Sequence, residues 1–377
     1  MTLQELVTDR QVVICCGTGG VGKTTTAAVL ALEGARRGRK ACVVTIDPAK
    51  RLADTLGLEA LTNNATEIDR DRWIDGDPDV TPGGQLFALM LDTKSTFDVL
   101  VTRNAESPEQ GQRILDNTFY RNVSGALGGT QEYMAMEKLH ELHDEGGFDL
   151  IVVDTPPTRH ALDFLDAPRR LTRLLDNRIF RLLMAPTRAS LKVASVAVQT
   201  FLRTVARVVG SEVIDDVIAF FRAFEGMEGG FRERAQAVEA LLADPDTAFV
   251  LVTTPRRDAL EEATFFAERL SRNGQRVQAL IVNRVHPPFG DESPDGLRTT
   301  AEAVRLEQSE PGQRLAEMYE NLANFREIAR LERDHIEAMR EKIGSADVAY
   351  VPYLSHDVYD FGALHEVGQL MLDTIGS

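Results

Sequence analysis

The chain has 377 residues, of which 43% are hydrophobic and 27% are charged, proportions that are ordinary for a soluble globular protein. A chain of this length can bury a large core, as one domain or as two lobes. The formal net charge of −16 argues against a protein that binds nucleic acid, because affinity for a phosphate backbone requires a clustered basic surface.

Two further features bear on where the protein works. No run of about 18 apolar residues occurs and residues 2–10 are polar, so we predict neither a transmembrane segment nor a signal peptide. The three cysteines, Cys15, Cys16 and Cys42, lie in predicted core strands, and an odd, buried set is a poor disulfide framework. We therefore expect a protein of the reducing cytoplasm.

A glycine-rich stretch, GTGGVGKTT at 17–25, fits the phosphate-binding pattern G-x-x-x-x-G-K-[ST]. An apolar run at 12–16 precedes it and helix-forming residues follow at 26–32, which is the strand–loop–helix context that the motif requires. Glycines let backbone N–H groups surround an anion, and the positive end of the following helix points to the same phosphates. Lys23 would reach the β- and γ-phosphates, and the Thr24 hydroxyl would hold Mg²⁺. We therefore predict that this stretch binds ATP and Mg²⁺ and is not merely an ordinary glycine-rich turn. The predicted binding residues are Gly17, Thr18, Gly19, Gly20, Val21, Gly22, Lys23, Thr24 and Thr25.

A second apolar strand at 41–46 ends in Asp47-Pro48. Asp followed by Pro is a good helix start, with Asp as the N-cap and Pro at the first helical position. A carboxylate at the carboxyl end of a strand beside a phosphate loop can also orient the attacking water. Asp47 is therefore a candidate catalytic residue, together with Lys23, and the capping interpretation stays open beside it.

The next strong signal is the apolar strand DLIVVD, which ends in Asp154. The chain before it predicts a polar connection at 61–84, a short strand at 86–91, a mixed and polar segment at 92–125 and a helix at 131–144. A buried strand that ends in Asp after a phosphate loop is typical of a Walker B element. Asp154 would then hold the magnesium through water, and the turn at 155–160 could sense the γ-phosphate.

From 163 to 242 the composition becomes helical, with apolar helices predicted at 171–184, 190–209 and 213–224. Two interpretations remain open for their apolar faces: the core of an ordinary helical subdomain, or an exposed groove for the hydrophobic segment of another protein.

The sheet resumes with strands at 247–253 and 277–282, the second ending at Asn283, and with a last strand at 348–353. A charged helical region is predicted at 296–343, interrupted near Pro311, and a closing helix begins near Phe361. Alternating strands and helices predict an α/β fold with a doubly wound, mainly parallel sheet, a P-loop NTPase fold with helical insertions. We expect a single domain over 1–377, with a helical subdomain inserted at 163–245 and a second helical insertion at 286–345.

These motifs together resemble the ArsA-type ATPases, which include the arsenite-pump ATPase and the ATPase that targets tail-anchored membrane proteins. The resemblance rests on GTGGVGKTT at 17–25, TIDPAKRLADTLG at 45–57, DTPPTRHALDFL at 154–165, VNR at 282–284 and VPYLSHDVYDFGAL at 351–364. It implies that Asp47 positions the hydrolytic water and that Asn283 and Pro352 belong to the adenine pocket. It also implies a nucleotide-switched, dimeric, cytosolic ATPase that handles a protein client, similar to divergent bacterial homologues of the targeting factor.

The sequence departs from that family at three places. Thr18 stands where the family usually has a lysine that crosses the dimer interface. The Cys-x-x-Cys zinc motif and the arsenite-binding cysteines are absent. Arg159 stands where the relatives usually have a small residue. Arsenite export and a zinc-clamped dimer are therefore not expected. The partner is either a second copy of the chain or a lysine-bearing paralogue, with a hydrophobic protein as client and no nucleic acid.

Three alternative functions are less well supported. A regulatory subunit of a heterodimeric ATPase, with little turnover of its own, is favoured by Thr18. The acidic charge and the long insertions argue against a partitioning or positioning ATPase. A metabolic kinase is disfavoured because no lid of the kind such enzymes need can be recognised in the sequence.

Overall fold

The computed structural model describes residues 2–46, 51–74, 80–123, 130–156, 158–177, 211–306, 308–344 and 346–372. Its centre is an eight-stranded sheet in the order β3-β4-β2-β5-β1-β6-β7-β8. The strands are β1 (Val12–Gly17), β2 (Lys40–Thr45), β3 (Thr66–Ile68), β4 (Gln85–Met90), β5 (Leu150–Asp154), β6 (Thr247–Thr253), β7 (Val277–Val285) and β8 (Asp347–Pro352). Neighbouring strands pair in parallel apart from the edge pair β3 and β4. The predicted fold class is confirmed.

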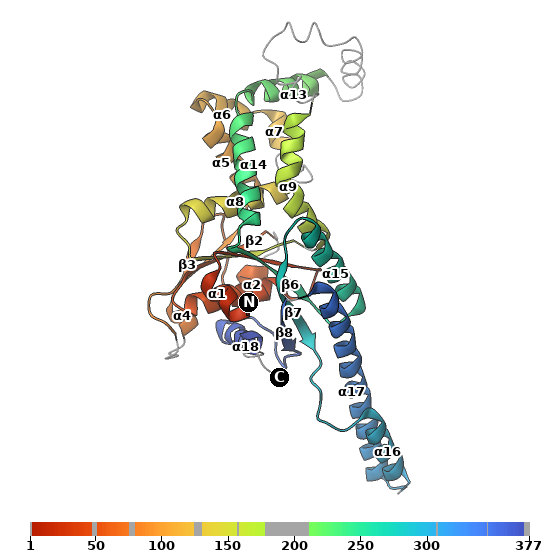
Figure 1. The fold of residues 1–377 in the computed structure, drawn as a ribbon. Coiled ribbons are helices and arrows are strands. Elements are labelled where there is room, and N and C mark those ends of the chain that lie inside the picture. Colours follow the sequence, from red (N-terminus) through yellow and green to blue (C-terminus); the bar gives the residue numbers. More distant parts are fainter. Residues whose placement is uncertain are drawn as a thin grey trace.

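Helices cover both faces of the sheet (Figure 1). One face packs against α1 (Leu3–Asp9), α2 (Lys23–Arg36), α3 (Arg51–Thr55) and α18 (Phe361–Leu372), and the other against α8 (Thr130–Glu145), α14 (Glu228–Ala243), α15 (Arg257–Arg272) and the end of α17 (Glu310–Ile343). Because side chains alternate along a strand, Cys15 belongs to the first core, and Cys16 and Cys42 to the second. All three thiols are buried and free, so their predicted place in the sheet core is confirmed.

A helical region stands on the second face. It consists of α5 (Thr93–Asn104), α6 (Pro108–Leu115), α7 (Thr118–Val123), α9 (Thr158–Asp176) and α13 (Ser211–Ala223) with parts of α8 and α14. These helices share a third core, which includes Tyr120, Phe224 and Phe231. The Phe-rich segment predicted at 213–224 is therefore at least partly core. The predicted helix at 190–209 lies outside the described residues.

The prediction of a mixed polar segment at 92–125 missed α5, α6 and α7. Their buried apolar faces are narrow, with Leu100, Val101 and Ile114 among the few contributors. The signals that could have found them are the caps: the Asp92 side chain accepts the backbone N–H of Ser95, and Ser107 precedes Pro108. Helices α1 and α4 (Asp71–Ile74) and strand β3 were also not predicted.

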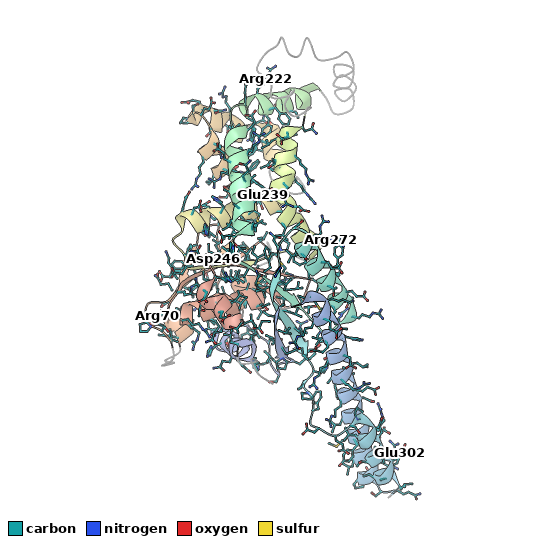
Figure 2. All side chains as sticks on the ribbon, in the orientation of Figure 1. Arg70, Arg222, Glu239, Asp246, Arg272 and Glu302 are labelled. Atoms are coloured by element: carbon teal, nitrogen blue, oxygen red, sulfur yellow. The ribbon has the colours of Figure 1, made fainter. Side chains whose placement is uncertain are left out.

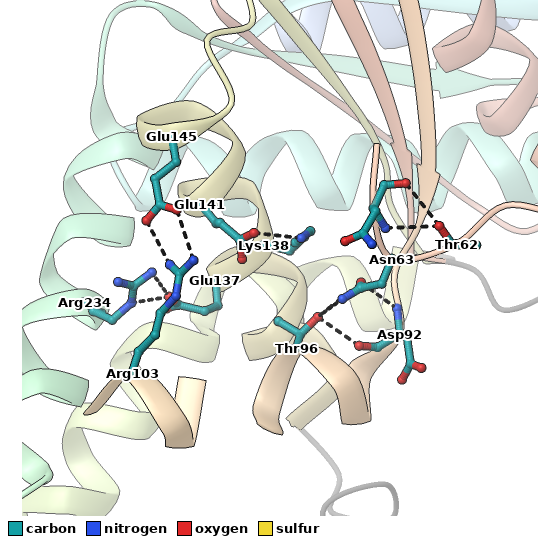
Figure 3. A network of polar contacts seen from close by, with 11 residues as sticks. Thr62, Asn63, Asp92, Thr96, Arg103, Glu137, Lys138, Glu141, Glu145 and Arg234 are labelled. Atoms are coloured by element: carbon teal, nitrogen blue, oxygen red, sulfur yellow. Dashed lines mark hydrogen bonds and ion pairs between the residues drawn. The ribbon is translucent and has the colours of Figure 1, made fainter. Parts of the chain in front are cut away.

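Polar contacts join the helices of the helical region to one another, and join α5 to the connection before β3 (Figure 3). Arg103 of α5 donates two hydrogen bonds to Glu145 of α8, at 2.8 and 3.0 Å. Arg234 of α14 pairs with Glu137 of α8, whose side chain is 3% exposed. Burial raises the pKa of Glu137, and the charge of Arg234 opposes that shift.

An arm of two antiparallel helices, α16 (Pro294–Arg305) and α17, projects away from the helical region (Figure 1). The predicted interruption near Pro311 is confirmed, because α16 ends at Arg305 and α17 begins at Glu310, with Pro311 in its first turn after the N-cap Ser309. Charged side chains lie on the outer surface of the molecule, for example Arg222 on α13, Arg272 on α15 and Glu302 on α16 (Figure 2). Within the described part of the chain, no helix combines the length and apolar character needed to cross a membrane.

Candidate nucleotide-binding site

The loop between β1 and α2 depends on glycine for its shape. A Cβ on Gly17 would lie 2.1 Å from the carbonyl oxygen of Val252, and one on Gly22 would lie 2.3 Å from the Asn283 side chain. Gly20 and Gly22 have φ values of +78° and +99°, in the left-handed region that favours glycine. The close approach of neighbouring backbone and the positive φ values explain the residue types of the motif.

Lys23 is the first residue of α2 and is only 7% exposed. Its ammonium group donates a hydrogen bond of 2.8 Å to the carbonyl oxygen of Thr18, so the side chain lies back along the loop. The charge is therefore held beside the loop's backbone, at the N-terminus of a helix whose dipole adds to it.

Asp154 lies directly beside the loop although it is 130 positions from Thr24. The two meet because β5 is the neighbour of β1, and both strands end at the same edge of the sheet. The Thr24 hydroxyl donates to the Asp154 carboxylate at 2.7 Å, and the Thr45 hydroxyl at the end of β2 donates to the same oxygen at 3.0 Å. Asp154 is 1% exposed, and Thr155 donates to the carbonyl oxygen of Cys15 at 2.7 Å, so the group is rigidly held. The sequence did not single out Thr45.

A cleft of about 330 Å³, which we call the phosphate cleft, opens over these residues. Its lining includes three residues of α3 that the sequence did not single out: Arg51, Asp54 and Thr55. The remaining lining comes from the loop, the end of β5 and β7: Gly19, Gly20, Gly22, Lys23, Thr24, Thr25, Asp154, Thr155 and Arg284. The candidate catalytic residue Asp47 lies outside the described residues.

A second cleft, of about 470 Å³, adjoins the first and is called the base cleft. Asn283 and Pro352 both line it, at the ends of the adjacent strands β7 and β8. The Asn283 amide also donates to the carbonyl oxygen of Val21 at 2.9 Å, which ties the end of β7 to the loop. The structure therefore brings the predicted base-side residues to the same sheet edge as the loop, with Gly22 and Thr25 shared by the two clefts.

The residues present fit a nucleotide with its magnesium ion. A glycine cradle and Lys23 suit a polyphosphate, and the Thr24 hydroxyl beside the Asp154 carboxylate is a set of oxygen donors of the kind that Mg²⁺ prefers. The two clefts have volumes in the range of small-molecule sites.

Comparison with known proteins agrees with this geometry. The model of a family described as anion-transporting ATPases, ArsA_ATPase, matches residues 10–326, which is most of the chain. The chain belongs to the ArsA ATPase family. The resemblance drawn from the motifs is thereby confirmed.

The ArsA relatives that match the chain are distant. A protein of Aquifex aeolicus named as an arsenical pump-driving ATPase is 26% identical over 293 residues, covering 74% of this chain and 64% of that protein. The ATPase GET3 of Malassezia globosa is 25% identical over 296 residues, covering 77% and 78% of the two chains. The ATPase ASNA1 homolog of Dictyostelium discoideum is 24% identical over 313 residues, covering 81% and 82%. The match to the Aquifex protein spans slightly less than two thirds of that protein's length.

Proposed function

We propose that this ArsA-family chain binds ATP with Mg²⁺ and hydrolyses it slowly. The observation that carries the proposal is the contact between Thr24 and the buried Asp154, 2.7 Å long, directly beside Lys23. A structural hydrogen bond alone would not require the lysine and the glycine cradle at the same edge of the sheet. Together they are the parts from which P-loop ATPases assemble a phosphate and magnesium site.

Each residue has a distinct task in this proposal. The loop N–H groups and Lys23 bind the phosphates, and Thr24 and Asp154 hold Mg²⁺, directly and through water. Magnesium, when bound, neutralises charge on the phosphate oxygens. Asp47 orients the water that attacks the γ-phosphate, and Asn283 and Pro352 bind the adenine.

Substitution of Asp47 separates its two interpretations. Asp47→Asn keeps a helix-capping side chain but loses the carboxylate, so we expect unchanged ATP affinity and a turnover reduced by about a hundredfold or more. Lys23→Ala serves as the contrasting variant and should lose nucleotide binding altogether. Binding is measured by calorimetry and turnover by phosphate release. Wild-type turnover in Asp47→Asn would leave only the capping interpretation.

We further propose a cytoplasmic, nucleotide-switched dimer that handles a hydrophobic protein client. Two observations support this proposal: the membership of the family, and the helical region, which α9 connects to the end of β5. The dimer is made either of two copies or of this chain with a lysine-bearing paralogue. A cation supplied across an interface to a transferring phosphoryl group is worth about 10³–10⁵ in rate, and Thr18 has neither the charge nor the reach to supply it.

The heterodimer is the arrangement that Thr18 favours, because this chain's nucleotide would then receive the partner's lysine. Arg159, in α9, is the alternative source of charge within the subunit. Turnover is measured for the chain alone, for Thr18→Lys and for Arg159→Ala. Slow turnover that Thr18→Lys raises supports the heterodimer. Fast turnover that collapses in Arg159→Ala contradicts it.

A second candidate function is a regulatory subunit that binds nucleotide with little turnover of its own. Thr18 is the observation that favours it. A chain that binds ATP and stays inactive both in Thr18→Lys and with its native partner would be such a subunit.

A further inference from the structure

Arg284 lies where three clefts around the phosphate loop meet. It lines the phosphate cleft, the base cleft and a third cleft of about 370 Å³, which also contains Thr18, Asp258 and Glu262. The sequence placed Arg284 in the VNR triplet but gave it no task.

The backbone of β7 is shaped to present this side chain. The register of β7 against β8 shifts between Asn283 and Val285, so Arg284 lies at a β-bulge, a feature that redirects side chains beside active sites. Its φ is +60°, an uncommon value for a residue other than glycine and one that clusters at functional sites. The Asn283 side chain accepts the Arg284 backbone N–H at 2.9 Å and supports that conformation.

The side chain crosses the loop, and its guanidinium donates to the carbonyl oxygen of Gly20 at 3.3 Å. Within the described ranges, no carboxylate forms an ion pair with it. Arg256, which lines the third cleft, is by contrast paired with Asp258 at 2.8 Å. A guanidinium is permanently charged, and its planar fork matches phosphate oxygens. Arg284 therefore brings to the loop a charge of the right geometry that is not taken up by an ion pair.

The overlap of the clefts indicates which phosphates it faces. The base cleft shares Gly22, Thr25 and Arg284 with the phosphate cleft, but not Lys23, Thr24 or Asp154. We propose that Arg284 binds the nucleotide phosphates nearest to the base, those common to ADP and ATP. This inference rests on the proposed function, because it concerns the same nucleotide.

The test compares three variants in Mg²⁺-dependent binding of ADP and of a non-hydrolysable ATP analogue. Arg284→Asn removes the guanidinium but keeps a residue that tolerates positive φ. We expect its Kd for both nucleotides to rise by about ten- to hundredfold, as for the loss of a hydrogen bond to a charged group. Arg284→Lys should recover part of the loss as a point charge. Arg256→Asn, the matched control, should bind like the wild type.

The KM for ATP supplies a second readout. Because Arg284 is proposed to bind the substrate, the KM of Arg284→Asn should rise together with its Kd. Unchanged Kd values in Arg284→Asn overturn the inference. So does a loss confined to the ATP analogue, which would assign the arginine to the terminal phosphate. If the wild type binds neither nucleotide, the proposed function fails instead.

Discussion

The sheet and the helical region are held together in different ways. Strands β1, β5 and β6 are buried along their whole length and almost entirely apolar, so the sheet interior is held by many interchangeable contacts. The helical region has its own smaller core, beside which the partly exposed Arg234 pairs with the buried Glu137 and joins two helices. A rigid sheet suits a site whose geometry must not change. A region that depends on individual polar pairs is better suited to rearrange.

The largest effect is expected on the reactivity of the cysteines that are buried inside the sheet. Burial raises the pKa of Cys16 and of Cys42 to about 12, which lowers the thiolate fraction roughly a thousandfold relative to an exposed cysteine. We expect alkylation by iodoacetamide at pH 8 to be at least that much slower in the native protein than in the denatured protein. Mass spectrometry of the labelled peptides measures both rates. Rapid native labelling would show that the sheet opens as readily as the helical region.

Two variants measure how much the pair Glu137 and Arg234 stabilises the helical region. Arg234→Ala leaves Glu137 as a buried charge without its partner, so we expect the free energy of unfolding to fall by about 3–5 kcal/mol. Chemical denaturation measures it, and the double variant Glu137→Met with Arg234→Leu should recover most of the loss because no charge then remains. A loss under about 1 kcal/mol in Arg234→Ala would mean that the pair does not hold the region together.

Nucleotide should act unequally on the two regions. Helix α9 begins four residues after Asp154, so a change in the turn between them is passed directly to the helical region. We expect hydrogen exchange in α9, α13 and α14 to differ by about tenfold between ADP and a non-hydrolysable ATP analogue, which corresponds to about 1.4 kcal/mol. Exchange in β1 and β5 should not change. Identical protection of the helices in the two states would indicate that they form an ordinary core that does not respond to the nucleotide.

The smallest effect on the free energy of unfolding is expected from an exposed ion pair of the helical region. Arg103 and Glu145 have side chains that are 38% and 55% exposed, and water replaces much of their interaction when it is lost. Arg103→Ala should therefore lower the free energy of unfolding by less than about 1 kcal/mol. The same denaturation experiment applies, and a cost equal to that of Arg234→Ala would remove the distinction between buried and exposed pairs.

The sequence predicted what depends on local pattern. Long apolar runs marked β1, β5 and β6, and the spacing of glycines and Lys23 marked the loop, because these features need only neighbouring residues. The proximity of Thr24 to Asp154 followed once both were placed at strand ends of a parallel sheet. The arrangement of β3, antiparallel at the edge, gave no such pattern.

What could not be predicted depends on contacts between distant segments. Thr45 and Arg284 lie in motifs that carry the family resemblance, but their contacts with Asp154 and with the loop depend on the order of the strands and on the bulge in β7. Helices α5, α6 and α7 bury few apolar residues each, and they are stable because they share a core with α13 and α14.

We propose that one site, built around Lys23, Thr24 and Asp154, hydrolyses ATP with Mg²⁺. The most direct measurement is the release of γ-phosphate from ATP by the purified chain, with Mg²⁺ and with excess chelator, beside the same assay on Lys23→Ala. We expect slow release that requires Mg²⁺ and is absent from Lys23→Ala, whose circular dichroism matches the wild type. Equal release by Lys23→Ala, or release that persists without Mg²⁺, would contradict the proposed function.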